Sequence, residues 1–156
     1  MTIYLPEIEL LILSIKPRFA HMILRGEKTI ELRRRSPRCL TEFWIALYAT
    51  TPEKAMIGVV RGSEVLVTTP DDLWELVKGG CALEREEYRR YYEGTNRAVG
   101  IRLAEPISFS TPVKLDRLRY SWPEFKPPQS FAYLTSEQIQ DVWDLAGMCF
   151  IRGTVG

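Results

Sequence analysis

The apolar positions along the chain change their spacing several times, and each spacing predicts a different element. Leu10–Ile15 is a short apolar run with the length of a buried strand. From Pro17 the apolar residues return with helical spacing, and Gly26 suits the position just past a helix end. We therefore expect a strand followed by a short helix.

A period of two, the spacing of a strand, begins after Gly26. Between residues 28 and 33, the polar side chains Glu31 and Arg33 face one way, while apolar side chains face the other. This pattern predicts a half-buried strand with a polar face.

Residues 43–49 alternate in the same way and end at a turn over residues 50–52. Trp44 and Tyr48 share one face of this predicted strand. Ala55–Val67 is rich in valine and isoleucine but contains two glycines, which is typical of a long, bent barrel strand.

The rest of the chain mixes helical and strand patterns. Helices are predicted at about 69–77, at 84–92 and from Thr135, with a strand at 97–103, an irregular segment at 114–131 and a closing strand at 148–151. Five to seven short strands with inserted helices favour an α+β fold built on a small β-barrel over a doubly wound sheet.

Composition is that of one ordinary globular domain over residues 1–156. Hydrophobic residues make up 46% and charged residues 26%, with a formal net charge of +1, so the signature of a disordered chain is missing. No signal-peptide pattern and no apolar run of membrane-spanning length occurs. We expect a cytoplasmic protein without a membrane partner.

Cysteine and histidine usage restricts the chemistry. Cys39, Cys81 and Cys149 are odd in number and far apart, which predicts reduced cysteines and no zinc site. No acidic cluster has metal-ligand spacing, so a metal, if used, would be a magnesium-like divalent ion held partly by phosphate. His21 is the only histidine and falls on a polar helix face, where we expect a surface role.

Positive charge is concentrated between Lys16 and Arg38, where eight basic residues and two acidic residues leave a local charge of +6. Such a patch attracts phosphate, and aromatic rings nearby can stack on unpaired bases. RNA is therefore the expected partner, and the expected contact residues are Lys16, Arg18, Glu31, Arg33, Arg34, Arg35, Trp44 and Trp122. The alternatives are a solvated strand edge for the arginines and core packing for the rings.

The stretch Gly26-Glu27-Lys28-Thr29-Ile30-Glu31-Leu32-Arg33 matches the G-x-K-x-x-E-x-R signature of ASCH domains, and it follows the expected strand and helix. The chain thus resembles the ASCH (activating-signal-cointegrator homology) family of the PUA-like group. This resemblance implies a PUA-like barrel with a cleft lined by the signature residues, RNA binding, and hydrolytic activity in some members.

Cleavage of RNA requires groups that move protons and groups that stabilise phosphoryl charge. One histidine excludes a two-histidine device, which leaves lysine, tyrosine and serine. We predict a ribonuclease acting on single-stranded RNA, with Tyr48, Lys54, Ser130 and Lys28 as catalytic residues that converge with Glu31 on the phosphate. Each residue alone also has an ordinary structural interpretation.

Other functions stay open at this point. Small ASCH members hydrolyse amide-like bonds on modified nucleosides through a threonine three residues after the lysine, a position that Glu31 occupies here. A non-catalytic PUA-like reader of RNA would hold one modified base among Trp44, Tyr48 and Trp122. The charged helix from Glu84 to Tyr92 would serve a protein-interaction role, with unknown partners.

Overall fold

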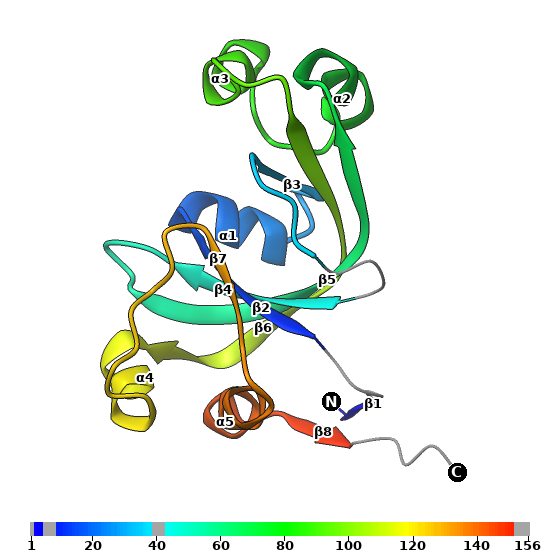
Figure 1. Cartoon of the computed structure of the whole chain (residues 1–156). Coiled ribbons are helices and arrows are strands. Elements are labelled where there is room, and N and C mark those ends of the chain that lie inside the picture. Colours follow the sequence, from blue (N-terminus) through cyan, green and yellow to red (C-terminus); the bar gives the residue numbers. More distant parts are fainter. Residues whose placement is uncertain (1, 5–8, 39–42, 152–156) are drawn as a thin grey trace.

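A curled six-stranded sheet forms the centre of the computed structural model, which describes residues 2–4, 9–38 and 43–151 (Figure 1). Every neighbouring pair in this sheet is antiparallel except β2 and β4, which are parallel. The spatial order of its strands is β3 (Ile30–Arg33), β6 (Ala98–Lys114), β5 (Ala55–Thr68), β4 (Phe43–Ala49), β2 (Leu10–Ile15) and β7 (Phe131–Tyr133).

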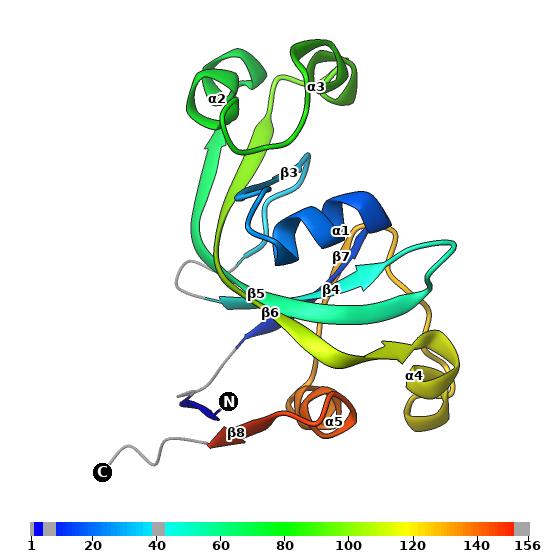
Figure 2. The same cartoon turned by 180° about the vertical axis from the view of Figure 1, so that it is seen from behind.

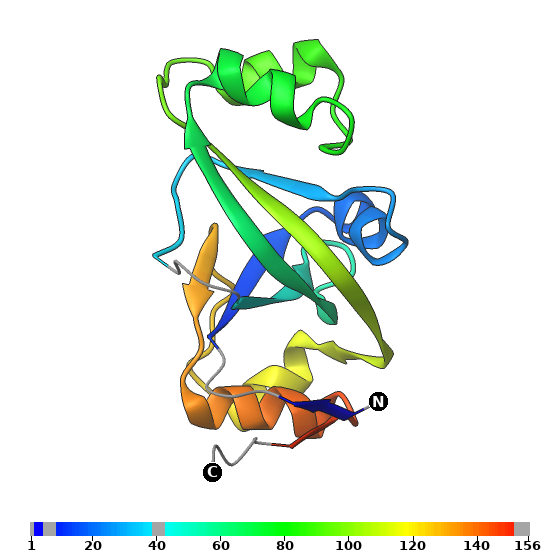
Figure 3. The same cartoon turned by 90° about the vertical axis from the view of Figure 1, so that its right-hand side faces the viewer.

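Helices cover both faces of the curled sheet, as Figures 1 and 2 show. They are α1 (Pro17–Leu24), α2 (Pro70–Val77), α3 (Arg85–Tyr91), α4 (Leu115–Ser121) and α5 (Ser136–Leu145). The long β5–β6 ribbon carries α2 and α3 at one end, and α4 and α5 lie toward the other (Figure 3). This arrangement confirms the predicted α+β fold with a small barrel-like sheet.

A separate two-stranded parallel sheet pairs β1 (Thr2–Tyr4) with β8 (Cys149–Ile151). The prediction of a strand near residue 148 is therefore confirmed, but that strand does not close the main sheet. The prediction of an irregular segment at 114–131 is wrong at its two ends. A seven-residue helix and a three-residue strand are too short to show a period, and α4 forms where Leu118 is buried.

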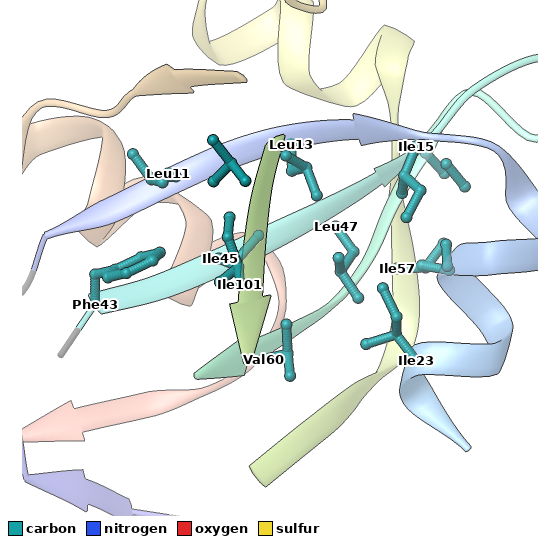
Figure 4. Close-up of a cluster of buried hydrophobic side chains, with 14 residues drawn as sticks. Leu11, Leu13, Ile15, Ile23, Phe43, Ile45, Leu47, Ile57, Val60 and Ile101 are labelled. Carbon is teal, nitrogen blue, oxygen red and sulfur yellow. The ribbon is translucent and has the colours of Figure 1, made fainter. Parts of the chain in front are cut away.

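Three apolar clusters hold these layers together. The first fills the inside of the curl beneath α1, where Leu13, Leu47, Ile23 and Ile101 point toward one another (Figure 4). The second lies between the outer face of β2 and β4 and the helices α4 and α5. The third joins β3 to α2 and α3.

Strand β4 is buried on both faces, so its alternating pattern does not separate a buried face from an exposed one. The predicted faces are correct, since Phe43 packs inside the curl and Trp44 and Tyr48 pack outside it. However, Trp44 is only 5% exposed, and Trp122 is 9% exposed and donates from Nε1 to Asp141 at 2.9 Å. The predictions that both tryptophans stack on RNA bases and that they form a cage with Tyr48 are therefore contradicted.

Gly58 lies at a close crossing of α1, β5 and β6. A Cβ atom there would come within 2.5 Å of the Ile107 carbonyl oxygen and 2.7 Å of the Leu24 side chain. Because the Ile107 backbone can move only a little to make room, Gly58→Ala should lower the free energy of unfolding by about 1–3 kcal/mol in urea denaturation. Gly79→Ala is the control, since its Cβ would meet nothing within 4 Å. Equal effects of the two substitutions would contradict the tight packing at Gly58.

Candidate nucleic-acid cleft

A cleft of about 600 Å³ opens between α1, β3 and α3. Its basic lining residues are Lys16, Arg18, Lys28, Arg33 and Arg90, its acidic ones are Glu31 and Glu87, and its apolar walls include Phe19, Leu83 and Tyr91. Four of the five basic residues come from the patch that the sequence predicts. The cleft therefore combines positive charge with apolar and aromatic walls.

The signature segment is held beneath the cleft by backbone hydrogen bonds. Gly26 adopts a φ of 77°, which reverses the chain after α1. The amides of Thr29 and Ile30 then both donate to the Gly80 carbonyl, at 2.9 and 3.1 Å. The loop after α2 thus positions the residues that follow, including Lys28 and Glu31.

Lys28, Glu31 and Arg33 form a buried charged group on the cleft floor. Lys28 Nζ lies 3.7 Å from Glu31 Oε2 and donates to the Cys81 carbonyl at 2.7 Å, and Arg33 Nε donates to Glu31 Oε1 at 3.1 Å. The side chains of Lys28 and Glu31 are only 4% and 7% exposed. Glu31, on the expected polar face of β3, is therefore buried, and the neighbouring Lys28 lies between the Phe19 ring of α1 and the Cys81 carbonyl.

Burial also changes the titration of Lys28. Desolvation lowers the pKa of its ammonium group below the ordinary value, while the nearby Glu31 carboxylate opposes this shift. The contacts to a carboxylate and a carbonyl oxygen are those of an ammonium group, which donates and does not accept.

Arg33 joins the two edges of the sheet. Its Nη1 donates to Ser130 Oγ at 3.3 Å and its Nη2 to the Ser14 carbonyl at 3.0 Å, so the end of β3 meets the start of β7 and the end of β2. The Ser14 amide donates to the Ser130 carbonyl, and Ser14 is the register partner of Tyr48. Ser130, Ser14 and Tyr48 therefore occupy neighbouring positions across β7, β2 and β4.

Tyr48 itself packs beneath α4 and α5 and is 2% exposed. Burial raises the pKa of its phenol, and the neighbouring Arg119 lowers it to a smaller extent. At neutral pH the hydroxyl group therefore stays protonated, so it can donate a hydrogen bond but is a poor base.

Lys54 is exposed in the turn between β4 and β5. The Thr50 amide donates to the Ile15 carbonyl at 3.0 Å, which places this turn beside the cleft lining. His21 Nε2 lies 2.6 Å from Glu53 Oε1, so the turn is also tied to α1. The partly exposed His21, expected at the surface, thus helps to position the turn that carries Lys54.

The structure separates the predicted catalytic residues. Lys28 lines the cleft and is connected to Ser130 through Glu31 and Arg33, whereas Ser130, Tyr48 and Lys54 are not among the residues that line the cleft. The predicted convergence of Lys28, Glu31, Tyr48 and Lys54 is therefore not seen in the cleft itself, since Tyr48 is buried beneath α4 and α5 and Lys54 is exposed in the turn before β5.

The remaining predicted contact residues differ in their surroundings. Lys16 and Arg18 are exposed along the cleft, and Arg18 pairs with Glu87 at 3.2 Å. Arg34 instead donates to backbone carbonyls at the end of α3 and does not line the cleft, so its local role is that of a helix cap. Arg35 is exposed.

Three residues of α3, Glu87, Arg90 and Tyr91, also line the cleft, and sequence reasoning missed them. That helix has charged residues on most positions, and its pattern is equally typical of a solvated surface. The one available signal was its tyrosines, which are too large and apolar for a fully solvated helix. Tyr91 is half-buried and donates to the Leu32 carbonyl at 3.1 Å.

Comparisons with known proteins agree with this architecture. The model of the ASCH domain family matches residues 13–112. A protein from Zymomonas mobilis, named ASCH domain-containing ribonuclease, is 34% identical over 143 residues, which cover 90% of this chain and 95% of that protein. A crystal structure of ASCH from Zymomonas mobilis is 33% identical with a TM-score of 0.83, and the match covers 87% of this chain and 94% of that chain.

A more distant match shares the fold alone. The N-terminal domain of McrB from Staphylothermus marinus is 17% identical with a TM-score of 0.57, over 92% of this chain and 98% of that domain. Within the described residues, no helix is long and apolar enough to cross a membrane, and no three His, Cys, Asp or Glu side chains gather as a metal site would require. Cys81 is free and buried, whereas Cys39 lies outside the described residues.

Proposed function

This chain belongs to the ASCH domain family, and from that premise we propose that it binds single-stranded RNA in the cleft and cleaves it. The observation that carries the proposal is the Arg33 bridge. One guanidinium group connects the buried carboxylate of Glu31 to the hydroxyl group of Ser130. The name of the Zymomonas mobilis relative supports the same activity.

Binding would begin with the attraction between basic side chains at the cleft and the phosphates of the RNA. Lys16 and Arg18 stand exposed at the cleft, where they can neutralise phosphates of an approaching strand. Arg33 is held by Glu31 and two further acceptors, so its guanidinium group is fixed in direction before RNA arrives. Fixed guanidinium groups recognise phosphate oxygens at a smaller entropic cost than mobile ones.

The apolar part of the cleft lining bears on the choice between a single strand and a duplex. The apolar walls from Phe19, Leu83 and Tyr91 suit the flat faces of unpaired bases, which a duplex keeps stacked inside. We therefore propose single-stranded RNA as the substrate.

For cleavage, we propose that Lys54 neutralises phosphoryl charge and that Tyr48 and Ser130 donate hydrogen bonds to the phosphate or to its leaving oxygen. The protonated state of the Tyr48 phenol suits a donor. Lys28 contributes its positive charge from the cleft floor.

The test is to incubate the purified chain with labelled single-stranded RNA, double-stranded RNA and single-stranded DNA, with magnesium or with a chelator, at two salt concentrations. We expect single-stranded RNA to be retained and cut, with retention falling as salt rises. Retention without any product, with or without metal, would contradict the nuclease activity. Loss of retention at low salt would contradict RNA binding itself.

A further inference from the structure

The Glu31 carboxylate has one oxygen without a hydrogen bond. Oε1 accepts from Arg33, but Oε2 has no hydrogen-bond partner among the described residues, although the side chain is only 7% exposed and lines the cleft. A buried acceptor of this kind is costly unless a partner completes it. The cleft floor thus contains a buried acceptor whose hydrogen bond no described residue supplies.

The charge around this oxygen restricts its partner. Lys28 Nζ lies 3.7 Å from Oε2, beyond hydrogen-bond distance, and Arg33 binds the other oxygen. Two positive charges already balance the carboxylate, so a further cation gains little there. A phosphate group would meet the negative carboxylate directly. A neutral N–H donor fits best.

Lys28 supplies the complementary group. An ammonium group has three N–H bonds, and one of them is used on the Cys81 carbonyl. The floor therefore offers an acceptor on Glu31 and a donor on Lys28, side by side. Every nucleobase carries such an adjacent donor and acceptor pair on its Watson–Crick edge.

We propose that the cleft floor is a base-recognition subsite, in which Glu31 Oε2 accepts an N–H from the Watson–Crick edge of one unpaired base and Lys28 donates to the adjacent acceptor. The base points inward between Phe19 and Tyr91, and the phosphates stay outside with Lys16 and Arg18. This inference rests on the proposed RNA binding and specifies its orientation. It also requires an unpaired base, because pairing occupies the same edge.

The test compares short single-stranded RNA oligomers of each base type with counterparts in which a methyl group replaces every N–H hydrogen of the Watson–Crick edge, so that the N–H donors are removed. For uridine, N3-methyluridine is the test and 5-methyluridine is the matched control, since its methyl group lies on another edge. We expect methylation of this edge to weaken binding at least about tenfold for one or more base types, as measured by fluorescence anisotropy.

Two substitutions show where the discrimination arises. Glu31→Ala should abolish the difference between methylated and natural oligomers, while Glu27→Ala should keep it, because Glu27 is an exposed neighbour paired with Arg25. Thermal unfolding of each variant checks that it is folded. If every oligomer binds equally to the parent chain, the subsite is overturned while RNA binding stands. If none binds, the proposed function fails.

Discussion

Replacing Arg33 with methionine should lower the free energy of unfolding by about 3–5 kcal/mol, the usual cost of removing one partner from a buried ion pair. The Arg33 side chain is 12% exposed and is a hydrogen-bond partner of Glu31, Ser130 and the Ser14 carbonyl. Its loss leaves the Glu31 carboxylate buried beside Lys28 alone and separates the two sheet edges. Chemical denaturation of both proteins measures the change.

A matched control is available at the end of α1. Arg25 also pairs with a glutamate two residues away, Glu27, but both side chains are more than half exposed. Arg25→Met should therefore produce little measurable change. Adding Glu31→Gln to the Arg33→Met variant should recover part of its loss, because the unpaired buried charge is then removed. Equal stability of the Arg25 and Arg33 variants would show that the bridge is not structural.

Local signals in the sequence predicted the helix ends well. Thr69 accepts from the Asp72 amide at the start of α2, and Thr135 with Gln138 forms a capping box at the start of α5. Gly26 has the positive φ that a residue past a helix end needs. These features depend on residues within one turn of each other, so a single sequence contains all the information that they require.

The burial of β4 depended on distant segments. The alternation placed Trp44 and Tyr48 on one face, but it could not show that α4 and α5, from the last third of the chain, cover that face. An aromatic strand face looks the same in sequence whether it meets a helix or solvent. For this reason the sequence predicts an RNA contact for Trp44, which belongs to the core.

The candidate site also combines residues that a local motif predicts with contacts that only the fold creates. Lys28, Glu31 and Arg33 were predicted from a local motif, but the Cys81 carbonyl that accepts from Lys28 comes from a loop 53 residues away in sequence. The contact between Arg33 and Ser130 joins residues 97 apart in sequence, which no periodic pattern encodes. Sequence therefore predicted several of the residues that line the cleft, while the bridge between Arg33 and Ser130 required the fold.

Removing the Tyr48 hydroxyl group should slow RNA cleavage by about 100-fold, if this phenol donates to the phosphate in the transition state. Tyr48→Phe keeps the buried ring, so the fold and the RNA affinity should remain unchanged. Single-turnover rates and binding measured separately would show a loss in rate alone. Tyr120→Phe is the control, because Tyr120 is 79% exposed and lies outside the proposed site.

Lys54→Ala and Ser130→Ala complete this experiment, because we propose that both residues act on the same phosphate, one from the turn before β5 and one from the position before β7. Lys54→Ala should reduce the rate and also weaken the salt dependence of binding, since one phosphate contact is lost. Lys78→Ala removes an exposed lysine paired with Glu75 and should change neither. If Tyr48→Phe and Lys54→Ala cut RNA as fast as the parent chain, the chemistry belongs elsewhere. The buried group of Lys28, Glu31 and Arg33 would then be the first place to search, because it holds the cleft's most desolvated charges.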